Sequence, residues 1–390
     1  MPVVRTPLAW YNLTHNKRRL AVALAGVTFA VVLMFVEWGF RNAMLDSTVA
    51  LVDHIDGDLI IVHQRSYSLV GPVPFSRQRL FQALAVEGVR ETHPIYLEYG
   101  ATWLNPQDRK QHSIRAIGVN PKAHVLDFPE LQTRSAELHL PYRILFDTRS
   151  RLPSYGINPS QVSPDEEFSL GGKSVHIVGT FALGTDFGTE GNVLMSDATF
   201  MTLFRPLTTD SSPAGVDIGV VRLNEGADRR EVQRRLADAI GEDVVILTKD
   251  EFSEREKSFW KNSTPIGFAF GFGMAIGFTV GVVICYQVLA TDVADHLPQF
   301  ATLKAIGYSN RYVIGVVLQE ALLLGTVGFI PGLLISLVIY EFLSVQTGLP
   351  MKPLPDRILF LFALTIGMCI VSGLIAQRKV QTADPAEVFG

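Results

Sequence analysis

The amino-acid sequence predicts a polytopic α-helical membrane protein with four transmembrane helices and a large α+β periplasmic domain between the first and second spans. Composition is the first reason, because 48% of the 390 residues are hydrophobic and only 18% are charged. A soluble protein is usually about 25% charged. Distribution is the second reason, because the apolar residues fall into four blocks. Roughly two hundred residues of ordinary soluble composition separate the first two blocks, enough for a domain with its own core.

Four segments are long enough to cross a bilayer, which takes about 20 apolar residues in a helix. They are Leu20–Val36 (continuing past Glu37 to Arg41), Asn262–Thr291, Ala321–Tyr340 and Ile358–Gln377. A cleaved signal peptide is the alternative interpretation of the first segment, because three basic residues precede it. The segment is long for that role and no small-residue cleavage site follows it, so we expect a retained span.

Lysine and arginine in the short loops predict the orientation of the chain. They gather on one side of the predicted membrane, at Arg5, Lys17, Arg18, Arg19, Lys304, Arg311, Arg378 and Lys379. We therefore expect a protein of the bacterial plasma (inner) membrane, with both termini cytoplasmic and the large domain periplasmic. The two cysteines lie inside apolar blocks, so the outer domain is expected to fold without a disulfide framework.

These observations divide the chain into nine segments. In chain order they are a cytoplasmic amphipathic segment (1–19), the first span (20–41), the periplasmic domain (42–262), the second span (263–290), a cytoplasmic coupling loop (291–311), the third span (312–342), a short periplasmic loop (343–357), the fourth span (358–377) and a cytoplasmic tail (378–390).

Within the periplasmic domain, apolar residues at helical spacing predict that stalk helices extend the first and second spans outward, over 42–55 and 249–262. Short juxtamembrane linkers remain the alternative. Beyond the stalk the pattern is mixed α and β, with a βαβ unit near the end of the domain. A hairpin is expected to turn at Gly171–Gly172. The segment 126–200 is richer in Gly, Pro and Ser and predicts an inserted β-rich subdomain.

No catalytic, cofactor or metal site can be assembled from the sequence. Gly172-Lys173-Ser174 resembles the end of a phosphate-binding loop, but the first glycine of that motif is missing and a hairpin turn lacks the strand-to-helix junction. The histidines show no paired ligand spacing. A net charge of −4 argues against nucleic acid as a partner. We therefore expect a protein that is not an enzyme.

Small residues line the second and third spans, where they let helix backbones approach closely. The predicted helix-packing positions are Gly267, Gly271, Gly273, Gly277, Gly281, Gly328 and Gly332. Pro331 removes a backbone donor, so a kink is expected there. Glu320 is a charge near a span, and we favour a structural or gating role for it over the alternative of a proton relay.

The coupling loop contains a short amphipathic helix, Phe300–Ile306, which Gly307 is expected to cap. A short helix on the cytoplasmic face is suited to docking in the groove of another protein. A plain surface turn is the alternative. The residues predicted to contact that protein are Gln299, Phe300, Leu303, Lys304, Ala305, Ile306 and Gly307.

Three stretches together resemble one family. Phe300-Ala-Thr-Leu-Lys-Ala-Ile-Gly-Tyr-Ser is similar to the loop of FtsX-like and MacB-like ABC permeases, Glu320-Ala-Leu-Leu-Leu-Gly resembles their third span, and Asp384-Pro-Ala-Glu resembles their C-terminal ending. The chain resembles most the DevC-type permease of cyanobacterial glycolipid exporters, through Leu8-Ala-Trp-Tyr-Asn-Leu, Leu145-Phe-Asp-Thr-Arg-Ser-Arg and Gly179-Thr-Phe-Ala-Leu-Gly-Thr-Asp-Phe. Gln299 stands where the family loop commonly has an acid.

The resemblance implies a MacB-like periplasmic domain, with a porter-like part (56–125 and 201–248) around the inserted one. It implies a homodimer that binds a separate ABC ATPase, a periplasmic membrane-fusion protein and a TolC-like outer-membrane channel, in contact with membrane lipid. ATP would be bound by the ATPase, so this chain would need no cofactor. The function implied is the permease of an exporter of lipid-like or other substrates. The alternative is an FtsX-like, non-transporting regulator of periplasmic cell-wall hydrolases.

Overall fold

The computed structural model describes residues 10, 14, 17–158, 163, 166–186, 188–205, 215–263 and 265–382. Most of the predicted N-terminal segment (1–19) and the end of the predicted tail, from residue 383, lie outside the described residues. The chain forms two compact units. The membrane unit runs up to Asn42 and includes Pro265–Leu343 and the chain from Met351 onward, whereas the outer unit comprises Ala43–Thr264 together with Ser344–Pro350.

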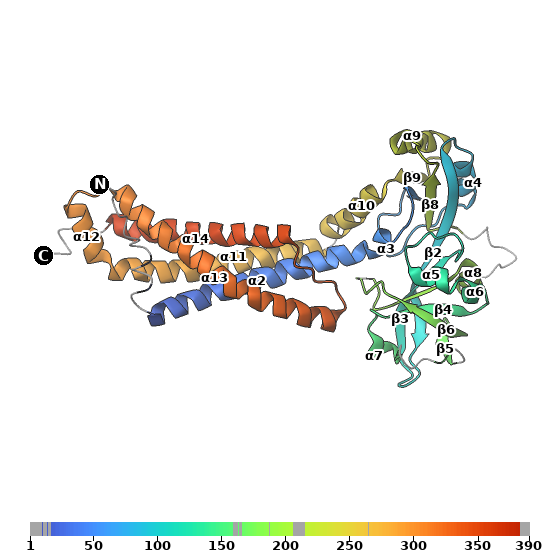
Figure 1. The fold of residues 1–390 in the computed structure, drawn as a ribbon, viewed down its shortest axis with the longest axis horizontal. Helices are drawn as coiled ribbons and strands as arrows, with labels where there is room; N and C mark the ends of the chain where they lie inside the picture. Colours follow the sequence, from blue (N-terminus) through green and yellow to red (C-terminus); the bar gives the residue numbers. More distant parts are fainter. Residues whose placement is uncertain are drawn as a thin grey trace. The chain divides into compact units, whose positions relative to one another are not determined.

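The membrane unit contains four helices that are long and apolar enough to cross a bilayer, which confirms the four-span prediction. They run alongside one another (Figure 1) and are α2 (Lys17–Thr48), α11 (Pro265–Asp295), α13 (Asn310–Thr347) and α14 (Pro355–Thr382). The short helix α12 (Leu297–Ala305) lies between α11 and α13 in the chain. Each long helix exceeds the predicted apolar segment, and α13 continues as a helix through Pro331.

Hydrogen bonds between helices hold this bundle together where polar side chains meet backbone carbonyls. The Tyr340 hydroxyl of α13 donates to the Phe35 carbonyl oxygen of α2 at 2.6 Å. The Ser372 hydroxyl of α14 donates to the Val282 carbonyl oxygen of α11 at 2.9 Å. Without water in the bilayer core, such groups need a partner inside the protein, so these bonds favour one relative position of the helices.

The stalk segments are helical in the outer unit. After a turn at Val49, helix α3 (Ala50–Asp53) follows α2, and α10 (Lys249–Asn262) precedes α11. Thr248 and Glu251 form a capping box at the start of α10, which satisfies backbone donors that the first turn would otherwise leave free. Phe252 is buried in the same apolar cluster as Val49 and Val52. The packing of apolar side chains therefore joins α10 to α3.

The outer unit is built on one nine-stranded sheet in the order β3-β7-β4-β6-β5-β2-β8-β1-β9. The strands are β1 (Leu59–His63), β2 (Val89–Leu104), β3 (Gln111–Val119), β4 (Arg143–Asp147), β5 (Glu167–Leu170), β6 (Lys173–Phe181), β7 (Asn192–Ser196), β8 (Ile218–Leu223) and β9 (Val244–Leu247). The short helices are α4 (Gln78–Leu84), α5 (Pro129–Thr133), α6 (Ser135–Leu138), α7 (Leu152–Tyr155), α8 (Asp197–Phe204) and α9 (Arg229–Ala239).

Strand β2 belongs to both halves of the sheet. Its first half pairs with β8, and its end pairs with β5. Between Glu98 and Ala101 the register with β3 shifts, at Gly100 with φ of +80°, and such a bulge bends a strand. Because β3 also pairs with β2, the six strands β2, β3, β7, β4, β6 and β5 form a closed circuit. The strands of the predicted insertion, β4 to β7, therefore share a small barrel with β2 and β3.

The other half of the sheet is an open layer of β2, β8, β1 and β9. Strand β1 is antiparallel to both β8 and β9, so the β8–α9–β9 unit predicted from the sequence encloses β1 between its two strands. The predicted hairpin is also confirmed, because β5 and β6 pair around Gly171 and Gly172, with φ of +58° and +76°. Both positive values are typical of a type I′ turn.

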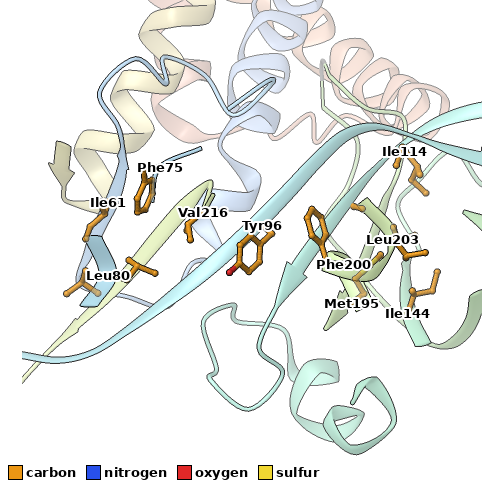
Figure 2. Close-up of a cluster of buried hydrophobic side chains, with 14 of the residues drawn as sticks. Ile61, Phe75, Leu80, Tyr96, Ile114, Ile144, Met195, Phe200, Leu203 and Val216 are labelled. Carbon is orange, nitrogen blue, oxygen red and sulfur yellow. The ribbon is translucent and has the colours of Figure 1, made fainter. Parts of the chain in front are cut away.

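One hydrophobic core continues across both halves of the sheet. Figure 2 shows Ile61 of β1 with Phe75, Leu80 and Val216, which pack beside the open layer, on one side. On the other side it shows Ile114, Ile144 and Met195 of the barrel strands with Leu203 of α8. Between them lie Tyr96 of β2 and Phe200 of α8, whose rings stack with centroids 5.8 Å apart. The two halves therefore have no solvent-filled boundary along β2, and we expect them to fold as one body.

Candidate functional site

The predicted coupling segment forms the helix α12 and a capped turn after it. Gly307 follows with φ of +106°, a conformation that glycine adopts without the strain of a Cβ atom. The backbone amide of Tyr308 donates to the Leu303 carbonyl oxygen at 3.0 Å, which is the long hydrogen bond of a Schellman cap. The structure thus has the helix end that the sequence predicts at Gly307.

The two faces of this segment differ in burial. Phe300 is only 3% exposed and packs with Val293 of α11 and with Val316 and Val317 of α13, while Leu303 packs against the same cluster. Burying an aromatic side chain of this size contributes about 1.5–3 kcal/mol. The inner face therefore fixes α12 to the two helices that flank it in the chain.

The other face and the tip are open. Ile306 is 71% and Tyr308 is 47% exposed, and Gln299 and Gly307 are also exposed. The backbones of Lys304 and Ala305 are helical, but their side chains lie outside the described set. An exposed isoleucine beside an exposed tyrosine, both at the end of a rigidly packed helix, is an arrangement suited to docking on another protein. Of the seven predicted contact residues, Phe300 and Leu303 thus anchor the helix, whereas Gln299, Ile306 and Gly307 are presented outward.

The predicted packing glycines occupy different environments in the membrane unit. A Cβ atom at Gly281 would lie 3.0 Å from that of Ala30, and one at Gly332 would lie 2.6 Å from Val31 Cγ1, so both glycines allow close approach to α2. A Cβ atom at Gly273 would lie 2.6 Å from Glu37 Oε2, and one at Gly328 would lie 2.8 Å from Val27 Cγ1, whereas one at Gly277 would be in ordinary contact with Met34 at 3.6 Å. Around Gly271 the described residues place no such neighbour within 4 Å. Gly267 lies in α11 and is half-buried.

Glu320 is fully buried within the membrane unit. The next residue, Ala321, lies close to α14, because a Cβ atom added at Gly373 would lie 3.3 Å from the Cβ atom of Ala321. A carboxyl group in such surroundings is costly unless its polar atoms are satisfied. The structural or gating role of Glu320 stays a prediction.

Glu256 is a buried carboxyl group that sequence reasoning missed. It lies on α10 and is 1% exposed, and it accepts hydrogen bonds from Ser68 Oγ at 2.9 Å, the Leu69 amide at 2.9 Å and Trp260 Nε1 at 2.8 Å. Burial raises the pKa of Glu256 above its ordinary value of 4.5, and the three hydrogen bonds oppose that rise. The signal in the sequence was its spacing, because Phe252, Glu256 and Trp260 lie four residues apart on one helix face.

A cleft of about 960 Å³ opens on the outer unit. Its cationic side chains are largely matched by nearby carboxylates: Arg222 binds Asp56 at 2.6 Å, and Arg229 lies 3.6 Å from Asp58. Arg222 also donates to the His124 carbonyl oxygen at 2.6 Å. The arginine therefore ties the end of the stalk to β8 and the loop at His124, and the cleft is not a strongly charged surface.

Comparison with known proteins adds a family match for the C-terminal part of the chain. Residues 271–385 match the family model described as FtsX-like permease C-terminal. This range includes α12 and α13 whole, most of α11 and the described part of α14.

Two solved structures are similar to part of the chain. One is the periplasmic region of MacB from Actinobacillus actinomycetemcomitans, at 9% identity and a TM-score of 0.35, covering 54% of this chain and 95% of that chain. The other is the extracellular domain of the noncanonic ABC-type transporter YknZ from Gram-positive bacteria, at 13% identity and a TM-score of 0.33, covering 49% and 99%. Because both TM-scores are below 0.5, neither structure assigns the fold of the outer unit. What the comparisons show is therefore a similarity of the membrane part, where residues 271–385 match the model of the FtsX-like permease C-terminal domain.

Proposed function

We propose that this chain is the permease subunit of an ABC-type exporter and that α12 receives the motion of a separate ATPase. The observation that carries the proposal is the two-sided packing of α12, with Phe300 buried against α11 and α13 and Ile306 exposed at the tip. A load applied at Ile306 would pass into two spans through Phe300. The segment lies within the range that matches the FtsX-like permease model, which supports this role.

In the proposed cycle, the ATPase closes on ATP and pushes α12. In the chain, α3 follows α2 and α10 precedes α11, and these segments would carry the motion to the periplasm. The outer unit would then expel a substrate toward a membrane-fusion protein and a TolC-like channel. We further propose that the permease is a homodimer and that both termini of each chain are cytoplasmic. The proposed substrate is lipid-like, such as a glycolipid. No step needs a reactive group of this chain.

Exchanging Ile306 for serine tests the docking role. We expect Ile306→Ser to reduce recovery of the ATPase at least tenfold after mild crosslinking in native membranes, because the loss of one central contact often costs more than about 1.4 kcal/mol. Val345→Ser is the matched control, since Val345 is 74% exposed but lies at the other end of α13. Equal recovery from both variants would contradict a docking role for Ile306.

The same purification separates the two functional classes. An ATPase recovered with a membrane-fusion protein supports the exporter. An ATPase recovered with a cell-wall hydrolase and without a fusion protein supports the non-transporting regulator instead. Recovery of no ATPase from the unsubstituted protein would reject both.

A further inference from the structure

The outer unit includes a short piece of chain that comprises the last turn of the third membrane helix, α13, and the three residues after it. Ser344–Pro350 groups with this unit rather than with the membrane unit. Thr185 Oγ1 donates to the Thr347 carbonyl oxygen at 3.3 Å, and Leu349 is buried. Gly348 has φ of +72°, and a Cβ atom there would lie 2.8 Å from Thr185 Oγ1. The segment Ser344–Pro350, called the seated loop below, is therefore closely fitted to Thr185.

Thr185 belongs to a strap, residues 183–186 and 188–192, which buried polar groups hold in place. Asp147 accepts from the backbone amides of Leu183 at 3.0 Å and Gly184 at 2.8 Å. Asn192 donates to Asp147 at 2.6 Å and to the Gly184 carbonyl oxygen at 2.7 Å. Asp147 and Asn192 are both fully buried. The part of the strap that contacts the seated loop is thus fixed by four hydrogen bonds away from solvent.

An ion pair extends this network to the other end of the strap. Arg115 of β3 pairs with Asp186, donates to Asn192 Oδ1 at 2.7 Å, and donates to the Tyr99 hydroxyl at 2.8 Å. The side chains of Arg115 and Asp186 are 2% and 4% exposed. Asp186 also accepts from the Gly188 amide at 2.8 Å. A rearrangement of the strap would therefore have to break a buried charged pair, which is strongly unfavourable.

The far end of the strap packs against the loop that Glu256 holds. A Cβ atom at Gly188 would lie 2.6 Å from Val70 Cγ2 and 3.1 Å from Tyr99. Val70 follows Ser68 and Leu69, which both donate to Glu256 of α10. Contacts between described residues therefore connect α10, through 68–70 and the strap, to the seated loop.

We infer that the strap is a mechanical relay that couples the position of α10, which leads into the second span, to the seated loop between the third and fourth spans. The chain then has a link between its membrane helices that does not run through the cytoplasmic segment α12. Because every contact in the relay lies within the outer unit, the inference stands independently of the ATPase and of the substrate.

The test measures how often the seated loop opens in the resting, full-length protein in nanodiscs, without nucleotide. In Leu349→Cys the new thiol is protected while the loop is seated, and its reaction with a membrane-impermeant maleimide reports local opening. The native cysteines, Cys285 and Cys369, are buried, and the protein without Leu349→Cys gives their background.

Two substitutions at the far end of the relay test whether opening of the seated loop depends on the contacts of α10 or only on the contact with Thr185. Glu256→Gln and the milder Ser68→Ala do not touch the seated loop, yet we expect each to speed labelling of Leu349→Cys. Ser68→Ala removes one donor to Glu256, and the amide nitrogen in Glu256→Gln cannot accept from the Leu69 amide as a carboxyl oxygen can. For Glu256→Gln we expect about a tenfold increase, which corresponds to about 1.4 kcal/mol. Glu254→Gln is the control, because Glu254 is an exposed glutamate on the same helix. It should leave the labelling rate unchanged.

Thr185→Val removes the hydrogen bond to the seated loop directly and should speed labelling, which verifies that the assay detects opening. Thr185→Ser, which keeps the hydroxyl group, is its control. The inference is overturned if Thr185→Val speeds labelling while Glu256→Gln and Ser68→Ala do not, because the seat is then local. It is overturned also if Glu254→Gln acts as strongly as Glu256→Gln, or if no variant changes the rate. Should Glu256→Gln fail to fold, Ser68→Ala alone decides, since it leaves the Leu69 and Trp260 bonds to Glu256 in place.

Discussion

At the residue scale, we expect substitution within the buried ion pair of Arg115 and Asp186 to lower the stability of the outer unit strongly. Burial alone would lower the pKa of Arg115, but Asp186 and Tyr99 outweigh that effect and raise it. The guanidinium thus stays charged, and its burial is compensated only by partners that are themselves buried.

Arg115→Met should therefore destabilise the outer unit by about 3–5 kcal/mol, because it leaves the Asp186 carboxylate buried without its cation. Urea unfolding of the full chain, followed by hydrogen exchange in β3, measures the change. Arg134→Met is the control, since the Arg134–Glu137 pair is 49% and 42% exposed and such pairs contribute less than about 1 kcal/mol. Similar losses of unfolding free energy from both variants would show that the buried ion pair stabilises the outer unit no more than an exposed pair does.

Glu256 gives the outer unit a pH dependence with a defined sign. Its pKa in the folded protein is raised by burial above the ordinary 4.5, so the folded state binds this proton more tightly than the unfolded state does. The stabilisation is complete below pH 4.5 and is lost as pH rises through the raised folded pKa. Protection against hydrogen exchange in α10 and residues 68–70, measured relative to the base-catalysed intrinsic rate, should fall over that range in the unsubstituted protein. Glu256→Gln should remove this fall in protection, and a persisting fall would assign it to another group.

At the scale of elements, glycines decide how closely the membrane helices approach. Gly332→Ala should lower the melting temperature of the purified protein by the equivalent of about 1–3 kcal/mol. The reason is that its Cβ would lie 2.6 Å and 2.8 Å from two atoms of the β-branched Val31, which has little freedom to move aside.

Gly315→Ala is the matched substitution in the same helix. The described residues place nothing within 4 Å of a Cβ atom there, so alanine should leave the protein unchanged or stabilise it by up to about 1 kcal/mol through its higher helix propensity. Thermal unfolding monitored by size-exclusion chromatography compares the two. A lower melting temperature for Gly315→Ala would mean that a neighbour outside this chain occupies that face.

At the scale of the whole molecule, the two compact units should unfold separately. The outer unit has its own apolar core around β2, whereas the membrane unit is held by helix packing in lipid, which urea disrupts poorly. We expect urea to remove the β-sheet signal of the circular dichroism spectrum in one transition while most of the helical signal remains. Coincident loss of both signals would show that the units are one cooperative body.

Local patterns in the sequence determined the four spans, the hairpin at Gly171–Gly172 and the end of α12 at Gly307. Each of these depends on hydropathy or on the backbone freedom of residues close together in the chain, so a short window contains the whole cause. The two-sided packing of α12 was only partly predictable. Its amphipathic pattern was visible, but which residue packs inward depends on α11 and α13.

Only the tertiary structure decided the closure of the barrel, the burial of Glu256, the pairing of Arg115 with Asp186 and the seating of Ser344–Pro350 on Thr185. The partners in these contacts are far apart in the chain: 71 residues separate Arg115 from Asp186, and 162 separate Thr185 from Thr347. A charged residue has the same local pattern whether it faces water or a buried partner. The choice between them is made by strand register and loop position, which no short stretch of sequence contains.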